Sequence, residues 1–133
     1  MNSFDFLNSK PDLQRIIINS NLLNIIPGGF AIATDNTCKT IIHNPVSAKF
    51  LRIEPWEKFS HSSYNPPAVK VIKNGKPMKA EEMPMQRAAQ YGEDVVGEEL
   101  EFLWGDGVSK IARWSASALR DENGNICGCI ATM

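Results

Sequence analysis

The residues of this chain that are best suited to chemistry are its cysteines and histidines. Cys127 and Cys129 lie two positions apart in a predicted strand, so we expect their side chains to point to the same side. Together with Cys38 and His43 they supply the sulfur and imidazole ligands that zinc prefers. The simpler interpretation is that the cysteines are small apolar residues packed in a strand, and we expect no bound metal.

A cluster of carboxylates at Glu98, Glu99 and Glu101 raises the question of acid–base catalysis. These residues lie on a predicted strand without a histidine partner, which is typical of a strand face exposed to solvent. Gly28 and Gly29 precede a predicted strand, whereas a glycine loop that binds phosphate precedes a helix. We therefore predict that the chain has no catalytic residues and is a regulatory domain rather than an enzyme.

A third group of residues, large and apolar, is suited to lining a ligand cavity. Such a cavity favours an apolar or weakly polar ligand, oriented by hydrogen bonds from serine, asparagine or Arg113. The alternative is that the same side chains fill a hydrophobic core. The set consists of Phe30, Ile32, Phe50, Trp56, Phe59, Phe102 and Trp114, and our candidate ligand-binding residues are Ile32, Phe50, Trp56, Phe59, Phe102 and Trp114.

Composition places the chain among globular domains of ordinary size. Of its 133 residues, 43% are hydrophobic and 22% are charged, and the net charge is −1. Because no block of lysine and arginine occurs, we expect no nucleic acid or membrane surface as a partner. No apolar run approaches the ~20 residues of a spanning helix. Three cysteines at unpatterned positions favour a reducing compartment, and we predict a cytoplasmic protein.

Hydrophobic spacing predicts the elements of the first half. Apolar residues at helical spacing, including Leu13, Ile16, Ile17 and Leu23, predict an amphipathic helix over 12–26. The Pro-Gly-Gly sequence that follows stops this helix. Further elements are expected as strands at 30–34 and 39–43, a helix at 45–52 begun by an Asn44 cap, and a buried helical turn at Trp56 and Phe59.

The second half is predicted to be mostly strand. A brief strand at 68–73 precedes the Asn74-Gly75 turn, and a helix over 84–91 ends at Gly92, a suitable left-handed cap. Alternation of apolar and polar residues then predicts three strands joined by turns at Asp106-Gly107 and Asn123-Gly124. These strands cover 100–104, 111–118 and 126–132.

Five segments in this order resemble a PAS domain of bacterial signalling proteins. They are LLNIIPGGFAI, HNPVSAKFL, NGKPMKAEEMPMQRA, GEDVVGEELEF and SASALRDENGNICGCIA, and the resemblance covers about Leu22 to Met133. It implies an α+β fold whose five-stranded antiparallel sheet has the order 2-1-5-4-3, with helices on one face around a small cavity. It further implies an N-terminal cap or dimerisation helix over 1–21 and a PAS domain over 22–133.

The resemblance also suggests cofactors that can be compared with the residues present. Flavin photosensors of the family need a cysteine within an Asn-Cys-Arg-Phe-Leu-Gln setting on a central helix, which this chain lacks. Haem sensors need a histidine on the helix predicted over 84–91, and that helix has none. His61 remains an alternative haem ligand, although a hydrogen-bonded histidine is the simpler interpretation. We therefore expect neither haem nor flavin, and at most an unidentified small ligand.

Two functions follow from the resemblance. In the first, the domain is a signal-input module that binds a small molecule and relays a conformational change to a C-terminal output domain, as in a two-component sensor histidine kinase. In the second, it is a ligand-free dimerisation and protein-interaction module of a diguanylate cyclase or transcription regulator. The implied partners are a second copy, held through the N-terminal helix and the outer sheet face, and an output kinase or regulator domain in cis.

Overall fold

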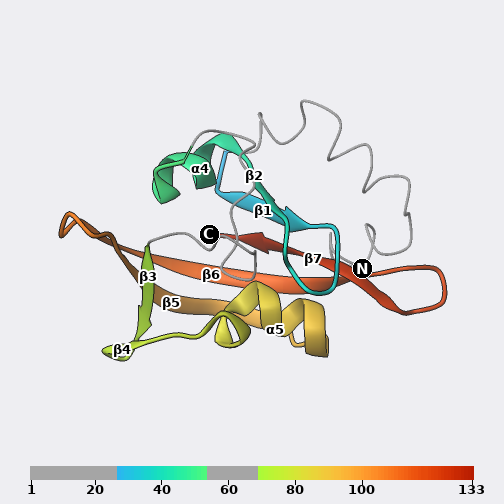
Figure 1. The fold of residues 1–133 in the computed structure, drawn as a ribbon. Helices are drawn as coiled ribbons and strands as arrows, with labels where there is room; N and C mark the ends of the chain where they lie inside the picture. The colour runs from blue at the N-terminus through green and yellow to red at the C-terminus, as the bar shows by residue number, and fades with distance from the viewer. Residues whose placement is uncertain (1–26, 54–68) are drawn as a thin grey trace.

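The structure is a computed structural model that describes residues 27–53 and 69–133. A single antiparallel sheet dominates it, with helix α5 along one face (Figure 1). The strands are β1 (Phe30–Ala33), β2 (Ile41–His43), β3 (Lys70–Lys73), β4 (Lys76–Pro77), β5 (Val95–Leu103), β6 (Ser109–Arg120) and β7 (Ile126–Thr132).

Seven strands form this sheet, in the order β2-β1-β7-β6-β5-β3-β4. The predicted α+β fold with a five-stranded sheet in the order 2-1-5-4-3 and helices on one face is therefore wrong. The difference lies in the hairpin of β3 and β4, which extends the sheet beyond β5. Val71 of β3 pairs with Phe102 of β5, and Ile72 pairs with Pro77 of β4.

A physical reason for the additional strands is the length of β5. It spans nine residues, and its pairing with β6 leaves the backbone groups of its other edge without partners from that strand. Strand β3 satisfies them from Lys70 to Ile72. Strand β4 ends the sheet with Pro77, which has no N–H to offer to a further strand.

Two α helices and a short 3-10 helix are the helical elements of the described residues: α4 (Pro45–Leu51), η1 (Ala80–Glu82) and α5 (Pro84–Tyr91). Helix α5 packs on β6 and β7 (Figure 1). It begins with Pro84, whose missing N–H costs nothing at a first helical position. It ends at Gly92 with φ of 70°, where the Gly92 N–H donates to Ala88 O, which confirms the predicted cap.

Two clusters of buried apolar side chains occupy opposite faces of the sheet. The inner cluster lies between the sheet and α5, and its members include Ala31, Ala33, Leu100, Phe102, Trp114, Ala116, Cys129 and Ala131 from the sheet and Met85, Ala88 and Ala89 from the helix. The outer cluster consists of Phe30, Ile32, Leu119 and Ile130, with Ile42 and Cys127 packed against it. Alternation along β1 and β7 explains this division.

Several predictions concern residues outside the described ranges. They are the helix over 12–26, the helical turn at Trp56 and Phe59, and the N-terminal part of the division into 1–21 and 22–133. These expectations stay predictions.

Asn44 joins three parts of the chain. Its Oδ1 accepts a hydrogen bond from Ser47 N at 3.1 Å, which confirms the predicted cap of α4, and another from Phe30 N at 2.9 Å. Its Nδ2 donates to Gly28 O at 2.8 Å. Because the side chain is fully buried, all three bonds are shielded from water, and the residue does more than cap a helix.

We predict that Asn44→Ala lowers the free energy of unfolding by about 2–4 kcal/mol, more than the ~1 kcal/mol of a simple cap, because buried groups lose their partners. Denaturant titration measures the change. The matched control is Asn125→Ala at an exposed asparagine whose backbone N–H, rather than its side chain, bonds to Asp121. A loss at Asn44 no larger than at Asn125 would contradict the role of the buried side chain.

Candidate ligand cavity

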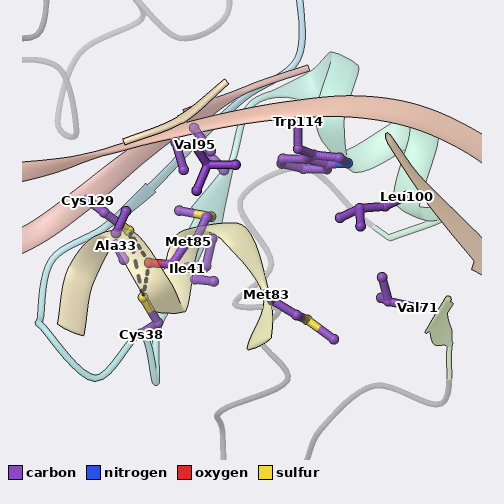
Figure 2. Close-up of a cluster of buried hydrophobic side chains, with 14 of the residues drawn as sticks. Ala33, Cys38, Ile41, Val71, Met83, Met85, Val95, Leu100, Trp114 and Cys129 are labelled. Carbon is purple, nitrogen blue, oxygen red and sulfur yellow. Dashed lines mark hydrogen bonds between the residues drawn. The ribbon is translucent and has the colours of Figure 1, made fainter. Parts of the chain in front are cut away.

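A cavity of about 60 Å³ lies between the inner face of the sheet and the helices. On the sheet side its wall is formed by Val71 of β3, Leu100 and Phe102 of β5, and Trp114 of β6. All four side chains are at least nine-tenths buried. The cavity therefore lies in the half of the inner cluster that contains the large side chains, as the positions of Val71, Leu100 and Trp114 in Figure 2 show.

The opposite wall is supplied mainly by the start of α5. Met83, Pro84, Met85 and Gln86 face the cavity, and β2 and the end of α4 complete the wall. Methionine side chains are unbranched and flexible, so they adapt to occupants of different shape. This wall can therefore change its shape at a smaller cost than a wall of branched or aromatic side chains.

Trp114 carries the most unusual polar group of the cavity. Its side chain is 6% exposed and its ring centroid lies 6.0 Å from that of Phe102. Its Nε1 is buried and has no hydrogen-bond acceptor among the described residues. In Figure 2 this nitrogen lies at the end of the indole nearer Leu100, another wall residue. An unpaired buried donor costs about 1–3 kcal/mol.

The other polar side chains of the wall are His43 and Gln86, both buried. His43 Nδ1 lies 2.7 Å from Ser47 Oγ, so the first turn of α4 fixes the orientation of the imidazole ring. Ser47 is itself held by the Asn44 cap through its backbone N–H. No lysine, arginine or carboxylate belongs to the wall that the described residues form.

The structure brings some of the predicted site residues together and separates others. Phe102 and Trp114 line the cavity. Phe50 is half-buried and contacts the edge of Phe102, with ring centroids 5.3 Å apart, but it is not part of the wall. Ile32 lies in the outer cluster, on the opposite face of the sheet. Trp56 and Phe59 lie outside the described residues.

Sequence reasoning missed the wall from α5. None of Met83, Pro84, Met85 and Gln86 is among the candidate ligand-binding residues predicted from the sequence. The available signal was the sequence Met83-Pro84-Met85, which places two flexible apolar side chains at a helix start.

Two thiols meet beneath α5. Cys38 Sγ and Cys129 Sγ lie 3.7 Å apart, and both donate hydrogen bonds to Met85 O, as Figure 2 shows. The close approach of Cys38, and then burial, raise the pKa of the Cys129 thiol well above its ordinary value. A thiol that stays protonated is a poor nucleophile and metal ligand, so Cys129 acts as packing in the inner cluster.

Cys127 does not join this pair, although we expected it to share a side with Cys129. A bulge interrupts the pairing of β6 and β7, where Leu119 faces Gly128 and Arg120 faces Ile126. The extra residue reverses the alternation, so Cys127 packs against the outer cluster. No group of three potential metal ligands occurs in the described part of the chain, and the expectation of no bound metal stays a prediction.

The carboxylates at 98–101 also differ from the expected exposed face. Glu98 has a side chain only 9% exposed, and its Oε1 accepts hydrogen bonds from Lys73 Nζ and from Arg87 Nη1, the latter at 3.1 Å. The cause is regular alternation, because Glu98 pairs with Trp114 as Leu100 pairs with Ala112, and its side chain therefore shares the inner face with Leu100. A bulge lies just before it, where Gly97 adopts φ of 59°. These ion pairs connect β3, β5 and α5 and thereby hold the helix over the sheet.

We predict that Glu98→Gln lowers the free energy of unfolding by about 2 kcal/mol at pH 7, since charge-assisted hydrogen bonds are lost. Burial acts to raise the pKa of Glu98, but the bonds from Lys73 and Arg87 outweigh it and lower that pKa. The ion-pair contribution is therefore complete above the unfolded pKa, roughly 4.3, and disappears as pH falls through the lower folded pKa.

Urea titrations of both proteins between pH 3 and pH 7 measure this difference. The matched control is Glu99→Gln. The Glu99 side chain is 61% exposed, and its Oε2 makes only a long ion pair of 3.9 Å with Arg113 Nε. A deficit of Glu98→Gln that stays constant down to pH 3, or equals that of the control, would be inconsistent with a stabilising ion pair.

Comparisons with known proteins show a distant structural likeness. No protein-family model and no curated protein matches the chain. A solved structure of the Vibrio cholerae VqmA dimer, a LuxR-type receptor in the absence of its target DNA, is similar with a TM-score of 0.49 and 17% identity. The match covers 90% of this chain and 49% of that chain, so this chain spans about half its length. A likeness at this level carries no argument about function.

The predicted set of partners is wrong as it stands. It combined a homodimer through the N-terminal helix and the outer sheet face, and an output domain in cis, with the exclusion of nucleic acid and membrane. Nothing in the described residues supports the expected homodimer or the exclusion of nucleic acid, and this set of partners is not proposed again. Within the described ranges, no helix has the length and apolar character needed to cross a lipid bilayer.

Proposed function

We propose that this chain is a signal-input module that binds a small molecule between its sheet and α5 and relays a conformational change to an output domain. The output of a two-component sensor histidine kinase is the one we favour, on the resemblance to PAS sensors. The observation that carries the proposal is an apolar cavity of about 60 Å³ whose wall contains the unpaired Nε1 of Trp114.

Both features cost stability in the empty protein. A cavity removes contacts that its wall would otherwise make, and an unpaired donor forfeits a hydrogen bond that water supplies in the unfolded chain. A ligand of suitable shape restores both. A site that is costly when empty therefore favours occupancy, which supports binding over simple packing.

The sheet offers a direct route for the relay. Trp114 belongs to β6, and two residues further along that strand Ala116 pairs with Ala131 of β7. A displacement of β6 around the indole is transmitted through this ladder to β7, which lies between β6 and β1. Because packed sheets respond as units, a small movement at the cavity can alter the position of the last strand.

The proposal includes the cellular compartment of the module. We place the module in the cytoplasm, where thiols stay reduced. The close approach of Cys38 and Cys129 without a bond between them supports this, because both thiols then remain donors to Met85 O.

Xenon tests the cavity, because it binds apolar cavities and is small enough for this one. We predict saturable shifts of the Met83 and Met85 methyl signals under xenon pressure, followed by ¹³C NMR. Val71→Leu, which adds a methylene to the wall, should weaken binding several-fold, whereas Val96→Leu, at a side chain that is 86% exposed, should not.

The relay is measured in the same titration. Amide signals of β7 should move with the saturation curve of the methyl signals. Methyl shifts that never saturate, or that are equally strong in Val71→Leu, would contradict binding in this cavity. A saturating cavity with unmoved β7 amides would refute the relay.

A further inference from the structure

The cavity wall carries information about the charge of its occupant. No side chain with a formal charge belongs to the described wall, and His43 is its titratable residue, held by Ser47 Oγ at 2.7 Å. A carboxylate, phosphate or ammonium group would lose its hydration there without gaining a counter-charge. The wall therefore selects against ions.

The wall also carries information about hydrogen bonding. The indole N–H group donates a hydrogen bond and cannot accept one. The unpaired Trp114 Nε1 can therefore be satisfied only by an acceptor. The rest of the sheet-side wall is hydrocarbon, from Val71, Leu100 and Phe102. A ligand that is mainly apolar and carries one hydrogen-bond acceptor is therefore complementary to this wall.

We propose, on the basis of the function proposed above, that the ligand is a small neutral molecule, mainly apolar, with one hydrogen-bond acceptor that meets Trp114 Nε1. A carbonyl oxygen or an unprotonated ring nitrogen provides such an acceptor. Trp114 is then the residue that determines specificity, because it separates acceptor-bearing molecules from plain hydrocarbons of the same shape.

The volume limits the size of this ligand. About 60 Å³ accommodates only a few heavy atoms without movement of the wall. A somewhat larger molecule requires displacement of Met83 and Met85, whose flexible side chains come from the first residues of α5 and the residue before it. Ligand size and the position of α5 are therefore coupled.

Two probes of equal shape test the proposal. Cyclobutanone and methylenecyclobutane differ in that a carbonyl oxygen replaces a terminal CH₂, and cyclobutylammonium adds a charge. Titrations of the intact chain, followed by the ¹⁵N–¹H signal of the Trp114 indole and the methionine methyl signals, give the three affinities. We expect cyclobutanone to bind roughly tenfold more tightly than the hydrocarbon and to move the signal of the indole proton downfield. Cyclobutylammonium should not bind.

Variants isolate the contribution of the donor. Trp114→Phe should abolish the preference for cyclobutanone while leaving methylenecyclobutane bound. The matched control, Trp104→Phe, changes a half-buried indole that is not part of the wall, and it should keep the preference. It also identifies the Trp104 indole signal by its loss. If Trp114→Phe does not fold, the direct shift of the Trp114 indole proton in the unmodified chain still decides the matter.

The outcomes separate this inference from the function on which it rests. Equal affinity for ketone and hydrocarbon, an indole proton that does not shift, or tight binding of the charged probe would overturn the inference and leave the cavity as a binding site. The same holds if xenon binds and neither neutral probe does. Failure of xenon and of every probe would overturn the proposed function itself.

Discussion

The packing of α5 on β6 and β7 is the constraint on which the rest of the structure depends. Where the helix meets β7, the side chains are small, with Cys129 and Ala131 on the sheet and Ala88 and Ala89 on the helix. Toward β5 and β6 they become large. The cavity lies where the large side chains of Leu100, Phe102 and Trp114 meet the residues at the start of α5.

The second fixed point is the start of α4. Asn44 binds the backbone at Phe30 and Gly28 as well as the helix it caps, and the capped residue Ser47 orients His43 toward its place in the wall. A capping interaction that usually stabilises only a helix end thus also sets the position of β2 beside β1. Together with the ion pairs of Glu98, which hold α5 from the other side, it makes the cavity rigid on two sides and adjustable at the methionines.

Local signals in the sequence predicted what local physics determines. Asn44, Pro84 and Gly92 mark helix ends because their side chains or dihedral angles act within a few residues. It is harder to predict which side of a strand faces α5. Alternation shows that Ile32 and Ala33 point to opposite faces of the sheet, but both are buried, so it does not show which of them lies on the inner face. A bulge reversed the expected side of Cys127, whereas Glu98 lies on the inner face by regular alternation with Leu100. The hairpin of β3 and β4 required knowledge of a free edge on β5.

The unpaired nitrogen of Trp114 could not be predicted from the sequence for a different reason. It depends on the lack of an acceptor near Nε1, and the sequence does not show which groups surround a side chain. A valine or leucine at this position would avoid the cost of the buried donor, and a larger residue at Val71 or Leu100 would fill the space beside it. Nothing in the packing of α5 requires the indole N–H, because the helix is held by small side chains and by ion pairs elsewhere. A polar group that the fold does not need, placed beside the cavity at the start of α5, is better explained by recognition than by stability.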